Sequence, residues 1–269
     1  MDPVNDDNNT NTIPWITLKS LSFDIYGTLV DWQNGLVDAA LRTPIAPYLP
    51  PDRAQLYDAL RRHDEAIEQE RPRCLKADVN AEAFRRLARD LGLVDEGTAS
   101  EADVERSATM YGGAIGTFPA FPDTVHAMQR LGQHYKLIAL SNIDHASFSR
   151  TLSGPLRDCR FDACYIAEDI GSYKPDLRNF DYLLSHLRSD FGIDRAEDAH
   201  VAQSLYHDHA ATGQIGLQSV WVDRYGGLER MARQQGRTAE EARAEHGYKL
   251  RVESLGELAD VVDMAFERG

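Results

Sequence analysis

The sequence predicts an α/β protein with a doubly wound, Rossmann-like parallel sheet and an inserted all-helical domain. A short apolar run ends in a lone carboxylate, Asp24, followed by a Gly-Thr turn, as at the end of a buried parallel strand. Residues 32–120 show helical spacing of apolar residues without a period-two segment, whereas strand and helix patterns alternate from Phe121 onward. The predicted division is a disordered tail at 1–14, a core at 15–31 and 121–269, and a helical domain at 32–120.

Composition limits the classes of partner. The 269 residues can bury a sizeable core, and 42% hydrophobic with 27% charged residues is ordinary for a soluble protein. The formal charge of −14 would repel nucleic acid and anionic membrane surfaces. We therefore expect no nucleic-acid or membrane partner.

The cysteines and the first residues indicate the compartment. Cys74, Cys159 and Cys164 are odd in number and lack metal-ligand spacing, so neither a disulfide framework nor a zinc site is expected. Residues 1–12 are polar and acidic, unlike a signal or transit peptide, and no apolar run approaches the ~20 residues that span a bilayer. These observations predict a cytoplasmic protein.

Three helices are predicted within residues 32–120. Asp52 can cap a helix that runs to about Arg71. A second helix, over residues 81–91, stops at Gly92, and a third covers residues 100–115.

The second part of the chain predicts βα units, which imply a parallel sheet with right-handed crossovers. A helix from Pro122 to about Gln133 comes first, and residues 224–247 form a solvated excursion near the end. Helices are also expected after Asp144, before Phe191 and over 255–266. The predicted strands are residues 136–140, 163–166, 200–202, 218–222 and 248–252.

Polar side chains fall where the predicted strands end. Asp24, the pair Ser141-Asn142, Lys174 and Asp208 come from four segments, and ligands of open parallel sheets bind at this edge. Each residue also has a local interpretation: Asp24 as a turn residue, Ser141 and Asp208 as helix caps, and Lys174 as a surface lysine. Their joint spacing favours a site.

Four segments in this order resemble the motifs of the haloacid dehalogenase superfamily of hydrolases, and the inserted helices resemble its cap domain. The segments are Asp24-x-Tyr26-Gly27-Thr28-Leu29, Leu140-Ser141-Asn142, Tyr173-Lys174-Pro175 and His207-Asp208. The resemblance implies that Asp24 is a nucleophile that forms a covalent ester. It also implies that Thr28 and Ser141 hold its second oxygen or the substrate, that Lys174 neutralises charge, and that Asn142 orients the substrate.

Tyr26 separates two branches of the superfamily. Phosphatases place a second aspartate there as an acid, and a phenol with a pKa near ~10 is a poor replacement. Gln203 occupies the position of a further magnesium acid, and Asp24 with Asp208 alone would bind Mg²⁺ weakly. A tyrosine at this position instead resembles the pattern of the 2-haloacid dehalogenases. In those enzymes an aspartate displaces halide without a metal.

Some positions depart from that branch. Gln203 and Leu205 stand where those dehalogenases have serine and asparagine, and Phe180 stands where they have tyrosine. A cap arginine is expected to gather halide and carboxylate, and Arg61 and Arg62 are the candidates. The alternative is that both arginines make ordinary helical pairs with neighbouring glutamates.

His207 and His209 flank Asp208 but do not share a helical face, so a metal site is not expected, and His207 is a neighbour that tunes Asp208. The sequence predicts a metal-independent hydrolase without a cofactor. Asp24 attacks an sp³ carbon of a small organic acid, and Tyr26, Asn142 and Gln203 contact the substrate. The alternatives are a Mg²⁺-dependent phosphatase acting on a small phosphate ester and a binding protein that has lost turnover. A homodimer is the default oligomeric state.

Overall fold

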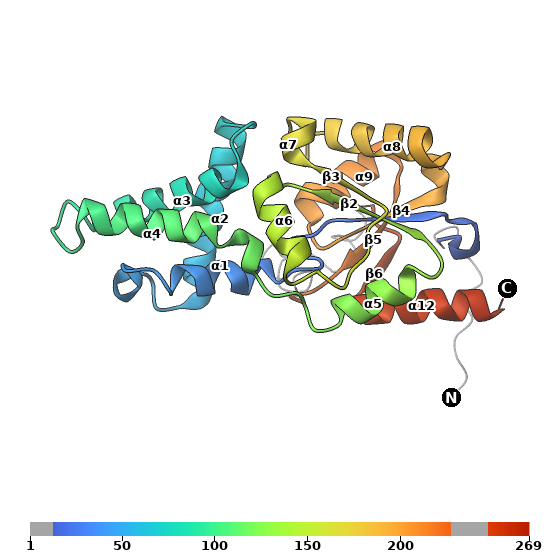
Figure 1. Ribbon diagram of the computed structural model, residues 1–269, viewed down its shortest axis with the longest axis horizontal. Coiled ribbons are helices and arrows are strands. Elements are labelled where there is room, and N and C mark those ends of the chain that lie inside the picture. The colour runs from blue at the N-terminus through green and yellow to red at the C-terminus, as the bar shows by residue number, and fades with distance from the viewer. Residues whose placement is uncertain (1–12, 227–246, 269) are drawn as a thin grey trace, which may run out of the picture.

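The computed structural model describes residues 13–226 and 247–268 as an α/β unit beside a block of helices (Figure 1). Residues 1–12 of the predicted tail and most of the predicted excursion at 224–247 lie outside the described residues. Among the helices described, none is long and apolar enough to cross a membrane.

In the part of the chain that the structure describes, the α/β unit is built on six parallel strands in the order β3-β2-β1-β4-β5-β6. The two central strands are β1 and β4, and their ends therefore meet at the middle of one edge. This arrangement confirms the predicted doubly wound sheet. The strands are β1 (Ser20–Phe23), β2 (Lys136–Ser141), β3 (Ala163–Ile166), β4 (Asp198–Ala202), β5 (Gln218–Val222) and β6 (Leu250–Val252).

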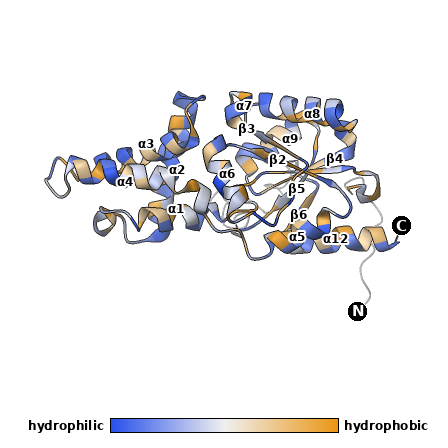
Figure 2. Ribbon diagram, in the orientation of Figure 1, coloured by the Kyte–Doolittle hydropathy of each residue, from blue (hydrophilic) through white to orange (hydrophobic). Residues whose placement is uncertain are grey.

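Helices cover both faces of the sheet (Figure 1). Helices α5 (Thr124–Leu131) and α12 (Leu255–Arg268) pack together on one face, and α8 (Arg178–Phe191) lies on the opposite face. Alternate strand residues join different clusters, since Leu137 packs in the larger core and Ile138 with Phe180 in the smaller one. The outward surface of α8 is mainly hydrophilic (Figure 2). This unit also contains α6 (His145–Ser153), α7 (Ala167–Ile170) and α9 (Ala210–Ile215).

The helical block contains the predicted helices and one more. Asp52 caps its helix as predicted, and Ser100 caps α4; each accepts a hydrogen bond from a backbone N–H three residues later. The second predicted helix begins at Lys76 instead of Ala81, because the structure buries the polar residues Lys76 and Asn80 inside it. The four helices are α1 (Trp32–Ala40), α2 (Arg53–Glu70), α3 (Lys76–Asp90) and α4 (Glu101–Gly113).

The chain enters and leaves the helical block at adjacent points. Val30 and Ala120 form an antiparallel bridge, and the Asp31 N–H donates to the Pro119 carbonyl over 2.8 Å. This geometry supports our proposal that residues 32–120 are a cap domain inserted into the core.

Several short helical turns connect these elements. The most consequential is η5, a π-helical turn that directly follows β4 and carries Asp208. β4 begins at Asp198 and not at the predicted His200, because the strand continues through buried polar residues. The short turns are η1 (Trp15–Thr17), η2 (Ala46–Tyr48), η3 (Ile115–Thr117), η4 (Arg195–Glu197) and η5 (Leu205–His209).

Candidate active site

Asp24 lies directly after β1 and is held by two donors. Its Oδ1 accepts from Lys174 Nζ over 2.9 Å, and its Oδ2 accepts from the Thr28 hydroxyl over 2.7 Å. The side chain is almost fully buried. Gly27 allows the tight turn between Asp24 and Thr28, because its φ is +100° and a Cβ there would approach Gln203 Oε1 to 3.2 Å.

Thr28 joins the turn that follows Asp24 to the end of β4. Its hydroxyl donates to Asp24 and accepts from the Gln203 N–H over 2.9 Å. The Gln203 carbonyl in turn accepts from Trp221 Nε1 over 2.8 Å. One hydroxyl therefore fixes both the carboxylate and the neighbouring loop.

Lys174 places a fully satisfied ammonium group between two carboxylates. Its Nζ donates to Asp24, to Asp208 Oδ1 over 2.7 Å and to the Leu140 carbonyl over 3.0 Å, so three protons meet three acceptors. Burial lowers the pKa of this lysine, but the carboxylates of Asp208 and Asp24 outweigh burial and raise it above its usual range. Lys174 therefore stays charged beside Asp24.

The second predicted motif supports Lys174 and adds a buried hydroxyl. Both halves of the Asn142 amide contact the Lys174 backbone: Nδ2 donates to its carbonyl over 3.0 Å, and Oδ1 accepts from its N–H over 2.7 Å. The Ser141 hydroxyl is buried without a hydrogen-bond partner among the described residues. Substrate contact by Asn142 stays a prediction, while its positioning of the Lys174 backbone is visible.

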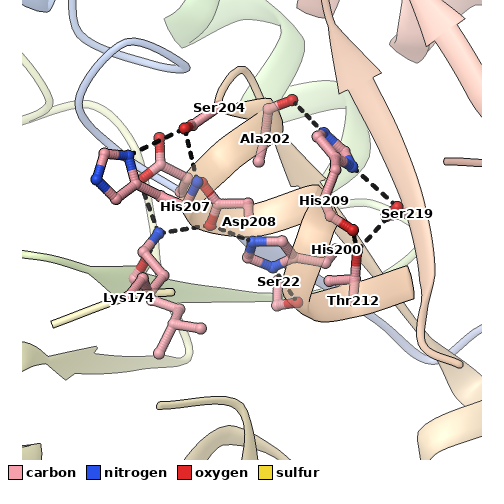
Figure 3. Close-up of polar contacts among 12 residues, drawn as sticks. Ser22, Lys174, His200, Ala202, Ser204, His207, Asp208, His209, Thr212 and Ser219 are labelled. Carbon is pink, nitrogen blue, oxygen red and sulfur yellow. Dashed lines mark hydrogen bonds and ion pairs between the residues drawn. The ribbon is translucent and has the colours of Figure 1, made fainter. Parts of the chain in front are cut away.

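Asp208 completes the cluster from the π-helical turn (Figure 3). Its Oδ1 accepts from Lys174 Nζ and from His200 Nε2, the latter over 3.0 Å. Burial opposes ionisation, but the Lys174 ammonium and the His200 hydrogen bond outweigh it and hold the pKa of Asp208 well below its usual range. Asp208 is therefore ionised, and its Oδ2 has no hydrogen-bond partner within the described part of the chain.

Tyr26 contacts both the α/β unit and the helical block. Its hydroxyl lies 2.6 Å from Thr151 Oγ1 on α6, and its ring contacts Trp32 edge-on at 5.4 Å between centroids. Burial raises the pKa of this phenol far above its ordinary value, although the Thr151 hydrogen bond partly opposes the shift. Tyr26 is consequently a neutral phenol and an even weaker acid than an exposed tyrosine.

The two predicted cap arginines keep their hydrogen bonds within α2. Arg61 forms an ion pair with Glu65 over 2.6 Å and is partly exposed, and Arg62 Nε donates to the Asp58 carbonyl over 3.3 Å. The helical-pair interpretation therefore describes Arg61 in this structure. Substrate binding by Arg61 or Arg62 stays a prediction without a contact that supports it.

Lys76 is a buried cation of the helical block that was not among the predicted site residues. Lys76 Nζ donates to Asp64 Oδ2 and Glu68 Oε1, both over 2.6 Å, and lies 5.3 Å from the centre of the Trp32 ring. Glu68 Oε2 reaches to 3.9 Å from His207 Nε2 of the core. A sequence signal existed, because a cation in the first turn of a helix opposes the helix dipole and calls for nearby carboxylates.

The histidines beside Asp208 have separate environments. His207 Nδ1 lies 3.0 Å from the Ser204 hydroxyl, and burial lowers the pKa of its ring although the Asp208 carboxylate partly opposes this. His209 is enclosed by the Ala202 carbonyl and the Ser219 hydroxyl, both at 3.0 Å. No group of three metal-ligating side chains occurs within residues 13–226 and 247–268.

The departures from the dehalogenase pattern also have defined places. Phe180 is fully buried and meets the His200 ring edge-on at 5.3 Å between centroids. Leu205 opens the π-helical turn, and the Gln203 amide lies over Gly27. These residues surround the cluster, and their contribution to substrate binding stays a prediction.

The fold and the site define an α/β protein with a carboxylate, a lysine and a second carboxylate joined by hydrogen bonds at one edge of its parallel sheet. The model of a family described as haloacid dehalogenase-like hydrolase matches residues 18–201, which is more than half of the chain. The protein therefore belongs to the haloacid dehalogenase-like hydrolases.

Similar proteins point to one branch. The chain is 26% identical over 221 residues to an (S)-2-haloacid dehalogenase of Pseudomonas sp. (strain YL), covering 78% of this chain and 85% of that protein. Its fold matches the L-2-haloacid dehalogenase of Xanthobacter autotrophicus with a TM-score of 0.69 at 19% identity, covering 91% and 98% of the two chains. A dehalogenase with an intermediate complex gives a TM-score of 0.70 at 22% identity, covering 91% and 97%. At these identities the structural matches support the fold.

Proposed function

We propose that the protein is a metal-independent hydrolase that removes halide, or a similar leaving group, from an sp³ carbon of a small organic acid. The observation that carries this proposal is the environment of Asp24. A buried carboxylate is oriented by Thr28 and kept beside a charged lysine, while the nucleophile turn supplies a neutral phenol in place of a second acid. The similarity to an (S)-2-haloacid dehalogenase supports the same chemistry.

The proposed reaction has two steps. One oxygen of Asp24 attacks the carbon, the new C–O bond forms as the C–halogen bond breaks, and halide leaves with the bonding electrons. Water then attacks the carboxyl carbon of the Asp24 ester and releases a hydroxy acid and one proton. A halide needs no protonation to leave, so the neutral Tyr26 is compatible with the first step.

Lys174 and Ser141 are our candidates for managing charge and binding. Lys174 remains paired with Asp208 when Asp24 becomes a neutral ester, so its ammonium keeps one buried counterion throughout. The Ser141 hydroxyl has no hydrogen-bond partner among the described residues, lies at the end of β2, which neighbours β1, and offers a donor for the substrate carboxylate. Lys76 supplies the buried cation on the cap side.

The oxygen donors do not fit a magnesium site, which the phosphatase alternative requires. Both oxygens of Asp24 and one oxygen of Asp208 accept hydrogen bonds from protein donors. Of the four carboxylate oxygens of Asp24 and Asp208, only Asp208 Oδ2 has no hydrogen-bond partner among the described residues. Mg²⁺ prefers about six oxygen ligands. The proposed reaction therefore uses no metal.

Halide release from a panel of 2-halo acids tests this function. We expect release by the wild-type protein, unchanged by EDTA, and none by Asp24→Asn, whose amide is a poor nucleophile. Arg85→Ala is a matched surface control, because Arg85 pairs with Glu105 on the cap away from the cluster. Phosphate release that needs Mg²⁺, with no halide release from any acid, would replace this function with the phosphatase.

A further inference from the structure

A row of buried polar side chains runs from Asp208 into the middle of the sheet. Ser20 and Ser22 lie on β1, and Asp198 and His200 lie on β4; all four are fully buried. Strands of a parallel sheet covered on both faces are normally apolar on both faces. The two central strands of this protein therefore depart from the usual pattern on one face.

The row is continuous. His200 Nε2 lies 3.0 Å from Asp208 Oδ1, and its Nδ1 lies 2.9 Å from Ser22 Oγ (Figure 3). Ser22 Oγ is 2.8 Å from Asp198 Oδ2, and Ser20 donates to Asp198 Oδ1 over 2.6 Å. The strand register makes Ser20 and Asp198, and likewise Ser22 and His200, direct neighbours.

Counting the hydrogens in the row shows that the His200 nitrogen facing Asp208 is a donor. Asp208 is ionised and can only accept, so His200 Nε2 carries a proton. Ser22 has one hydrogen for two neighbours. Either it donates to His200 Nδ1 and accepts from protonated Asp198, or it donates to ionised Asp198 and accepts from a protonated Nδ1. Both arrangements hold one proton between Asp198 and His200.

The two arrangements share their important feature, which is the Nε2–H directed at Asp208. Burial raises the pKa of Asp198 above its usual range, although hydrogen bonds from Ser20 and Ser22 oppose the shift. Buried polar groups stabilise a fold poorly compared with apolar side chains of similar volume. The row therefore calls for a role other than stability.

We propose that His200 is a positioning residue: it holds the Asp208 carboxylate against Lys174, and Ser22 with Asp198 holds His200. Lys174 Nζ lies 2.7 Å from Asp208 and 2.9 Å from Asp24, so movement of Asp208 displaces the ammonium from Asp24. Without His200, Lys174 would be the one donor left to Asp208 among the hydrogen bonds described here. The expected effect of His200 on turnover rests on the proposed function.

Two His200 substitutions separate positioning from packing. His200→Leu removes the donor and keeps the site apolar, whereas His200→Gln retains a side-chain N–H close to the position of Nε2. Ser219→Ala is the matched control. Ser219 is buried beside His200 in the strand register, and its hydroxyl contacts His209 and Thr212 instead of Asp208.

Crystal structures of these variants test the proposal without substrate. In His200→Leu we expect Lys174 Nζ to move beyond hydrogen-bond distance, about 3.5 Å, from Asp24 or Asp208. His200→Gln and Ser219→Ala should keep both contacts. Unchanged contacts in His200→Leu would overturn the proposal, whether or not the protein acts on halo acids.

Kinetics test the consequence. We expect kcat per folded site to fall about 10- to 100-fold in His200→Leu with KM within about threefold, and most of kcat to return in His200→Gln. Wild-type kcat in His200→Leu would also overturn the proposal.

If His200→Leu does not fold, Ser22→Ala replaces it in both experiments. We expect the same displacement of Lys174 and the same fall in kcat. No turnover by the wild type would defeat the proposed function, and the crystal structures would still decide the role of His200.

Discussion

At the scale of single residues, the site uses one donor for each oxygen of Asp24. Lys174 supplies positive charge, and Thr28 supplies a directed hydroxyl that is itself fixed by the Gln203 N–H. Both donors are buried, so water competes little with them. Loss of either donor should change the orientation of the Asp24 carboxylate.

Thr28→Val tests the hydroxyl without changing the volume of the side chain much. We expect kcat for halide release to fall about 10- to 100-fold, because Asp24 loses a charge-assisted hydrogen bond and the Gln203 N–H loses its acceptor. Thr28→Ser retains the hydroxyl and should stay within about fivefold of wild type by the same reasoning. Equal activity of Thr28→Val and Thr28→Ser would show that the hydroxyl does not orient the Asp24 carboxylate.

Asp64 gives the cap a pH-dependent stability. Burial raises its pKa to about 6, and the Lys76 ammonium only partly offsets burial. The folded state therefore binds a proton more tightly than the unfolded state, whose carboxyl titrates near ~3.8. This contribution to stability is complete below about pH 4 and is lost as the pH rises through about 6.

Asp64→Asn removes this titration. The free energy of unfolding of the wild type, measured by urea denaturation, should decline relative to the variant between about pH 4 and pH 6, by at most ~3 kcal/mol. Replacing the exposed pair residue Glu105 by glutamine is the control, since Arg85 lowers the pKa of Glu105 at an exposed position. A constant difference between wild type and Asp64→Asn across this range would refute the raised pKa.

The sequence predicted some of these residues and missed others for physical reasons. Asp24, Lys174 and Asp208 stand at the ends of strands, where the parallel topology brings polar side chains together, and the structure joins them by hydrogen bonds. Lys76 and His200 lie inside a helix and a strand, where their use depends on which neighbours the fold packs against them. Their sequence signals, a cation in the first turn of a helix and polar alternation in two strands, indicate buried partners without identifying them.

At the scale of elements, the π-helical turn η5 (Leu205–His209) sets the direction of Asp208. The Ser204 carbonyl accepts from the Asp208 N–H over 3.2 Å, the four-residue closure of an α-helix, and also from the His209 N–H over 3.3 Å, the five-residue closure of a π-helix. The wider turn contains one more residue than an α-turn. It delivers Asp208 to Lys174 immediately after β4.

Deleting Tyr206 tests the width of this turn. Tyr206 is exposed, so its removal should shorten η5 while leaving the core packing intact. We expect Asp208 to rotate by about 100°, one residue of an α-helix, away from Lys174 and halide release to be lost. Tyr206→Ala keeps the length of the turn and should retain activity. Wild-type activity of the deletion variant would show that η5 does not fix Asp208.

Polar residues alternate with apolar residues in both central strands, and this alternation was visible in the sequence. Ser20 and Ser22 alternate with apolar residues in β1, and Asp198 with His200 alternate in β4. Each pattern resembles a half-exposed strand, although both faces of the sheet are covered. Matching polar alternation in two central strands was the available signal for the buried row.

At the scale of the whole molecule, the predicted parallel sheet is confirmed, and the helical block lies beside the edge where the strands end (Figure 1). The order of strand and helix patterns was sufficient to predict this topology, because parallel crossovers allow few alternatives. The approach of cap to core was not predictable. It depends on specific contacts, such as the hydrogen bond from the Tyr173 hydroxyl to the Cys74 carbonyl and the approach of Glu68 to His207.

The central claim is that Asp24 forms a covalent ester, and one measurement tests it most directly. A single turnover of a 2-halo acid by excess enzyme in ¹⁸O-labelled water is followed by mass spectrometry of the peptide that contains Asp24. Attack by Asp24 predicts one ¹⁸O atom in the Asp24 carboxylate and none in the first hydroxy acid released, because water cleaves the ester at the carboxyl carbon. Label in the hydroxy acid with none in Asp24 would contradict the claim.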